Sequence, residues 1–110
     1  MDVTTDLNED GIVIVRTQGR LNMAAAPRLR GALAEVTVAR VRIVVDLSAV
    51  TFIDSSALGA LIGGLKSARQ AQGDLRIAAP TEQVNMVLGL TNLDRVLKPY
   101  RSVEEALDGW

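Results

Sequence analysis

Short apolar runs alternate with amphipathic stretches along most of the chain. The runs at 12–18 and 40–47 are rich in β-branched residues and nearly continuous in their apolar character. This pattern is typical of central strands that are covered on both faces. The preceding segment 2–7 is separated from the first run by turn-forming residues at 8–11, so the two are predicted to form an antiparallel hairpin. A further strand is predicted from Leu75 to Ala79, before Pro80.

Apolar residues at three- and four-residue spacing predict helices between these runs. The first helix is expected over about 24–38, with Asn22 as its cap and Pro27 in its first turn. A second begins at 54–56 and ends at Gly73, and a third follows a cap at Thr81. The remaining elements are a short edge strand at Val96–Leu97 and a brief last helix opened by a capping box, Ser102 to Glu105.

The order of these elements predicts an α/β fold. A mixed sheet of four or five strands would begin with the hairpin and carry three to four helices, all in one domain over residues 1–110. If the second and third strands are parallel, the loop at 22–26 and the turn at 54–56 follow their carboxyl ends and emerge at one edge of the sheet. Ligands and partners of open α/β sheets tend to bind at such an edge.

Composition and charge remove several classes of function. The chain has 12 basic and 13 acidic residues in a scattered arrangement, which disfavours nucleic acid as a partner. It contains no cysteine and no histidine, so thiolate and histidine catalysis are excluded and no metal or cofactor is expected. Asp46 and Asp54 lack a third acid nearby for a magnesium site. No segment is long enough for a membrane helix or has the pattern of a signal peptide, and a cytoplasmic location is expected.

Three polar residues, Asp54, Ser55 and Ser56, stand where the second helix begins. Asp54 or Ser55 could simply cap this helix, and the spacing alone favours that interpretation. The helix also contains Gly59, Gly63 and Gly64, which cost about 1 kcal/mol each relative to alanine. Either close packing inside the protein or a smooth docking surface for another protein could offset this cost.

The segment from Asp46 to Gly59 closely resembles the signature of the STAS domain family, specifically that of the bacterial anti-sigma factor antagonists. The segment 19–22 resembles the family's Gly-x-Leu-Asp motif after the second strand, and the segments 90–96 and 102–107 resemble its C-terminal region. Two positions differ: Asn22 stands where aspartate is commoner, and Ala57 where glycine is frequent.

The resemblance implies a regulatory binding protein, not an enzyme. Ser55 would accept phosphate from an anti-sigma factor that has serine kinase activity. The unphosphorylated form would bind this kinase and release the sigma factor, and a phosphoserine phosphatase would reverse the modification. The protein is expected to be a monomer or weak dimer. The partner-binding residues expected from this resemblance and from the predicted geometry are Asn22, Met23, Ala24, Ala25, Asp54, Ser55, Ser56, Leu58, Gly59 and Gly63.

An alternative keeps the same fold and changes the assembly. A STAS module could serve constitutively as the small subunit of a lipid-transport complex, or as part of a stressosome-like scaffold. Copurification with a transporter ATPase and the absence of phosphate on Ser55 would favour that alternative.

Overall fold

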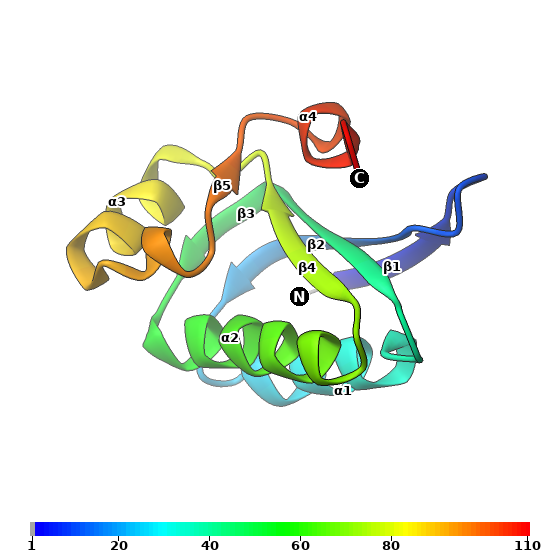
Figure 1. Cartoon of the computed structure of the whole chain (residues 1–110). Coiled ribbons are helices and arrows are strands. Elements are labelled where there is room, and N and C mark those ends of the chain that lie inside the picture. The colour runs from blue at the N-terminus through cyan, green and yellow to red at the C-terminus, as the bar shows by residue number, and fades with distance from the viewer. Residues whose placement is uncertain (1) are drawn as a thin grey trace.

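The predicted alternation of strands and helices is present in the computed structural model, which describes residues 2–110 (Figure 1). All four expected helices are found, together with five strands. In chain order the elements are β1 (Asp2–Leu7), β2 (Val13–Leu21), α1 (Ala26–Val36), β3 (Arg42–Ile53), α2 (Ser55–Gln70), β4 (Asp74–Ala78), α3 (Glu82–Thr91), the 3₁₀ helix η1 (Leu93–Arg95), β5 (Pro99–Tyr100) and α4 (Val103–Leu107).

The strands form one mixed sheet in the order β1-β2-β3-β4-β5. β1 pairs with β2 in the antiparallel hairpin that the turn at 8–11 predicts, and the other neighbours are parallel. Because β2 and β3 are parallel, with Val15 opposite Val45, their carboxyl ends lie at the same edge. This confirms the geometric condition on which the predicted site depends.

Helices cover both faces of the sheet (Figure 1), which is why the central strands have apolar residues at successive positions. Val15 and Val45 belong to the main hydrophobic cluster with residues of α1, α2 and α3. Their neighbours Ile14 and Val44 point to the other face and pack in a smaller cluster that includes Ala106 of α4. Burial of each such side chain contributes roughly 1.5–3 kcal/mol.

β3 is longer than the sequence predicts. The expected strand stopped at Leu47 and continued as a short turn to Asp54, whereas the structure has strand up to Ile53. Two register shifts against β2 explain the difference, since Arg16 and Gln18 pair with Asp46 and Ala49. Extra residues in β3 form bulges, which interrupt the alternation of buried and exposed side chains without ending the strand.

The predicted starts of β3 and α1 need correction. Arg40 is not part of β3, because its φ of 62° places it in a left-handed turn. α1 begins at Ala26 and not near Ala24. The Asn22 side chain caps the turn before the helix, where its Oδ1 accepts a hydrogen bond from the Ala25 N–H at 3.1 Å. Pro27 lies in the first turn of α1, as predicted.

Two further boundaries differ. α2 ends at Gln70, and Gly73 is needed instead where the chain enters β4, since a Cβ there would lie 1.8 Å from the Val41 carbonyl oxygen. The last strand is Pro99–Tyr100 and not Val96–Leu97, because the Val96 and Leu97 N–H groups close the turn of η1 onto Leu93. A proline without an N–H is compatible with an edge strand.

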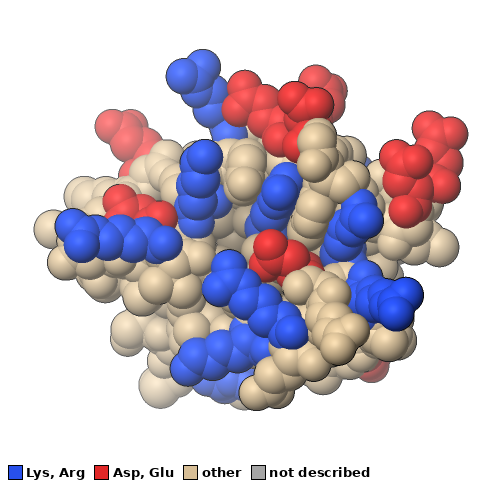
Figure 2. Space-filling view, in the orientation of Figure 1, with Lys and Arg blue, Asp and Glu red and all other residues tan. Residues whose placement is uncertain are grey.

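Charged side chains are unevenly spread over the face seen in Figure 2. Lys and Arg are prominent across its centre, while acidic side chains lie among them and toward the upper and right margins. Some of these charges are paired, as Arg69 Nε lies 3.3 Å from Asp74 Oδ1.

Candidate functional site

The Asp54 side chain joins the two loops that emerge at the carboxyl ends of β2 and β3. Its Oδ1 accepts a hydrogen bond from the Ala57 N–H at 3.1 Å, which caps α2. Its Oδ2 accepts one from the Met23 N–H at 2.9 Å, in the loop after β2. One carboxylate therefore satisfies a free N–H of the helix start and also fixes the neighbouring loop against it.

The loop after β2 has its own internal order. The Asn22 main-chain oxygen accepts hydrogen bonds from the Ala25 and Ala26 N–H groups at 3.0 Å each, in addition to the side-chain bond to Ala25. The Asp54 N–H donates to the Leu21 oxygen at 3.1 Å. An asparagine fulfils this turn role through its side-chain oxygen, so the loop does not require an aspartate at position 22.

The cap assignment leaves Ser55 uncommitted. Of the two capping candidates, Asp54 is the cap, and Ser55 is the first residue of α2. The Ser55 side chain is exposed, whereas Ser56 is half-buried. Within the described range 2–110, neither hydroxyl takes part in a hydrogen bond, and Ser55 is thus the accessible nucleophilic oxygen at this helix start.

The glycines of α2 divide between the two explanations that the sequence left open. A Cβ at Gly64 would lie 2.7 Å from Leu33 Cδ1, so Gly64 permits close packing of α2 on α1. A Cβ at Gly59 or Gly63 would have no neighbour within 4 Å. These two positions are exposed and leave an open, smooth surface on the helix.

Most of the residues expected to form the docking face are accessible, and one is not. Met23 is 73% exposed, although methionine is usually buried. Ala24 is also exposed, and Ala25 is half-buried. Leu58 is only 1% exposed and belongs to the main hydrophobic cluster. The expectation that Leu58 contacts a partner directly is therefore wrong. Leu58 instead packs in the core and anchors α2 there.

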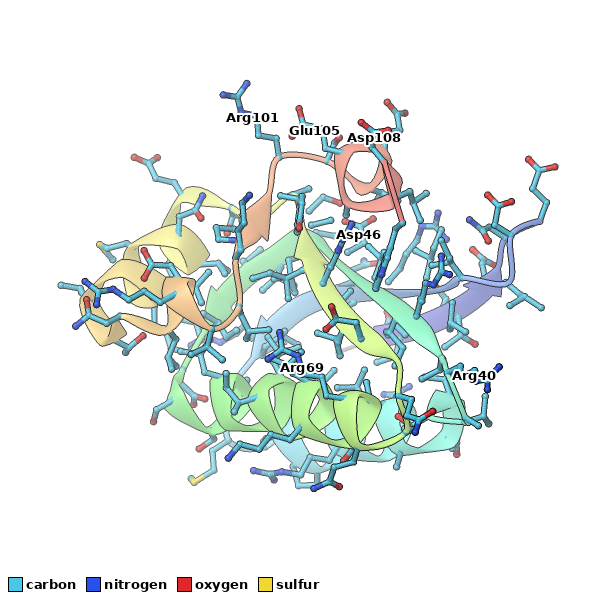
Figure 3. All side chains as sticks on the ribbon, in the orientation of Figure 1. Arg40, Asp46, Arg69, Arg101, Glu105 and Asp108 are labelled. Carbon is cyan, nitrogen blue, oxygen red and sulfur yellow. The ribbon has the colours of Figure 1, made fainter. Side chains whose placement is uncertain are left out.

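Asp46 has partners of its own and does not share a site with Asp54. It lies over the middle of the sheet (Figure 3). Its Oδ1 accepts a hydrogen bond from the Ser48 N–H at 3.0 Å, and its Oδ2 lies 3.8 Å from Arg16 Nε. Among residues 2–110, no group of three or more acidic, histidine or cysteine side chains is placed to hold a metal ion.

Sequence reasoning missed Gln83, which lies in the first turn of α3. Its Oε1 accepts a hydrogen bond from the Ile53 N–H at 3.0 Å, and its Nε2 donates to the Ile53 oxygen at 3.3 Å. Ile53 immediately precedes Asp54. A polar residue on a helix is usually assigned to solvent, and nothing in the sequence relates Gln83 to a residue thirty positions earlier.

Comparisons with known proteins agree with this fold. The model of the STAS domain matches residues 6–106. The chain is 30% identical over 93 residues to an anti-sigma-B factor antagonist of Listeria monocytogenes, which covers 83% of this chain and 80% of that protein. This chain therefore belongs to the STAS domain family.

Two further relatives carry related descriptions. A Thermotoga neapolitana protein, provisionally named an anti-sigma factor antagonist, is 42% identical over 67 residues, which are 61% of this chain and 59% of that protein. The crystal structure of an anti-sigma factor antagonist from Mycobacterium paratuberculosis superposes with a TM-score of 0.82 at 28% identity, covering 96% of this chain and 92% of that one. Across residues 2–110, no helix combines the length and apolar character needed to span a bilayer.

Proposed function

We propose that this protein is an anti-sigma factor antagonist that works by partner switching. The unphosphorylated form binds an anti-sigma factor with serine kinase activity and thereby releases the sigma factor. The kinase phosphorylates Ser55, binding is lost, and a phosphoserine phosphatase restores the binding form. Membership of the STAS family and the names of the relatives support the general role.

One observation carries the assignment to this residue: Ser55 is exposed at the start of α2 while Asp54 performs the capping. A serine that capped the helix would have its oxygen engaged by a helix N–H. Ser55 takes no part in the cap, so its hydroxyl is open to a kinase. Its hydroxyl can accept a phosphoryl group, with loss of its proton, and the helix keeps its cap.

The electrostatics of the site favour a switch in binding over a change in fold. A phosphate adds nearly two negative charges. At a helix N-terminus, where unpaired N–H groups carry partial positive charge, this is tolerated or stabilising by about 0.3–1 kcal/mol. In a closed interface the same charge would be desolvated beside Asp54, and an uncompensated charge there costs about 2–5 kcal/mol. The cost to the interface is therefore larger than the effect on the fold.

The docking face proposed for the kinase combines the loop after β2 with the exposed side of α2. Met23 offers a flexible apolar side chain, and such side chains adapt well to a partner surface. Gly59 and Gly63 allow another backbone to approach the helix closely. In sequence, Ser55 comes after the loop and before the two glycines. It is next to Asp54, whose carboxylate bonds both the loop and the helix.

The proposal can be tested with wild type, Ser55→Ala and Ser55→Glu as baits for partners in extract of the source bacterium. We expect a kinase-like ATPase to be retained by wild type and Ser55→Ala and lost with Ser55→Glu. Ser48→Glu is the matched control, because Ser48 is an exposed serine on β3 that lies outside both parts of the proposed docking face. Retention of the same partner by Ser55→Glu at wild-type affinity would refute the switch. Copurification with a transporter ATPase, and no phosphate on Ser55, would point to a constitutive subunit instead.

A further inference from the structure

β3 is supported unequally along its two sides. β2 pairs with β3 as far as Ile53. β4 pairs with β3 only from Arg42 to Asp46. In the part of the chain that the structure describes, residues 47–53 therefore have no strand beside them on the β4 side, although the site begins directly after Ile53.

Gln83 takes the place of the missing strand at the last residue of β3. The Asp54 N–H points to β2, where it donates to the Leu21 oxygen. The Ile53 N–H and oxygen point to the opposite side, and both bind the Gln83 side-chain amide, at 3.0 and 3.3 Å. A primary amide has the same donor and acceptor as a peptide group, so it can pair with a backbone as a neighbouring strand would.

These bonds hold the residue that precedes the functional carboxylate. Ile53 is only 1% exposed, and a buried backbone N–H and oxygen without partners would be costly. With Ile53 fixed on its β4 side by Gln83 and Asp54 fixed on its β2 side by Leu21, the direction in which the chain enters α2 is determined. The Asp54 carboxylate is then placed to reach both Ala57 and Met23.

We propose that Gln83 is a positioning residue for the phosphorylation site. It aligns Asp54 and Ser55 through the backbone of Ile53, and it links the start of α3 to the switch. This inference rests on the proposed function for the role of Ser55, but the alignment itself can be measured without any partner.

The first measurement is amide hydrogen exchange by NMR on the full chain. Gln83→Leu removes both bonds to Ile53, while Gln83→Glu keeps an acceptor for the N–H and loses the donor. Asn85→Leu is the control, since it is the same kind of change at an exposed position of the same helix. With Gln83→Leu we expect exchange to rise about five- to tenfold at Ile53, the size of one lost hydrogen bond, and to a smaller extent at Ala57 and Met23.

Gln83→Glu is expected to raise exchange at Ile53 less than Gln83→Leu, so it also tests the geometry if the leucine variant folds poorly. Val45 in the middle of β3 reports global opening. Unchanged exchange at Ile53 would overturn the proposal, and so would an equal rise at Val45, which would indicate general destabilisation.

The second measurement is phosphorylation by the cognate kinase. We expect Gln83→Leu to lower kcat at saturating protein by several fold, because a misaligned hydroxyl is bound but presented poorly. Asn85→Leu should match wild type. An unaltered kcat would overturn the link to the switch. If wild type itself is not phosphorylated on Ser55 while the exchange result holds, the proposed function fails and the alignment of Asp54 by Gln83 stands.

Discussion

The starts of α2 and α3 look alike in sequence but are built differently. Both helices follow a strand that ends at the same edge of the sheet, and both begin after a residue suited to capping, Asp54 or Thr81. Asp54 makes the cap bond to the Ala57 N–H. Thr81 occupies the cap position of α3 with no side-chain cap bond, and its Oγ1 is buried without a hydrogen-bond partner among the described residues.

The difference lies in where the polar groups of each start are directed. At α2, the carboxylate turns to its own helix and to the adjacent loop, and the serine beside it remains free. At α3, the polar group that matters is Gln83, which turns away from its helix to the end of β3. The start of α3 is therefore bonded to the end of β3 through Gln83, while its own cap position makes no side-chain bond.

The largest effect is expected from Asp54→Ala. This variant loses the cap bond and the bond to Met23, and we expect the free energy of unfolding to fall by about 2–3 kcal/mol, measured by urea denaturation. Glu82→Ala is the control, because Glu82 is an exposed acid in the first turn of α3 and should cost less than about 1 kcal/mol. Equal losses in both variants would show that the two helix starts are stabilised in the same way.

A smaller effect on stability is expected from Ser55→Glu. The new charge lies at the helix N-terminus and disturbs no hydrogen bond, so the free energy of unfolding should change by no more than about 1 kcal/mol, although the proposed function predicts that partner binding is lost. The urea midpoint and slope, compared with those of Ser48→Glu, check this. A loss well above this limit would mean that Ser55 is structurally required and that the binding defect is indirect.

The smallest effect is expected from Thr81→Val. This substitution preserves the shape of the side chain and removes a buried oxygen that has no partner, so we expect no change or a gain of up to about 1 kcal/mol in the free energy of unfolding. Thermal denaturation beside wild type measures it. A clear destabilisation would show that the hydroxyl has a partner in solution and that α3 is capped like α2.

Much of the fold followed from the hydrophobic pattern. The hairpin, the two central strands and the order of helices were predicted because period and turn residues are local properties. The wrong predictions concern segments whose structure is determined by tertiary contacts. The bulges of β3 depend on its register with β2, and the edge strand lies at 99–100 because η1 uses the backbone of Val96 and Leu97 for its own turn.

The site was predicted in part. The sequence singled out 54–56 and the loop at 22–25, and the structure joins them through the bond from Met23 to Asp54. Leu58 was misplaced, since its spacing fits a core position equally well and only the packing of α2 shows that it is buried. Gln83 gave no local signal at all.

The sequence by itself determined the hairpin, the central strands and the order of the helices, and it placed two serines after an aspartate at a helix start, because these depend on residues close together in the chain. Only the tertiary structure decided which polar group caps α2, which serine is exposed, and which glycines face open space. Those properties depend on distances between groups as far apart in sequence as Met23 and Asp54, or Ile53 and Gln83. The local sequence pattern does not determine such distances, because they are set by the way the helices and loops pack around the sheet.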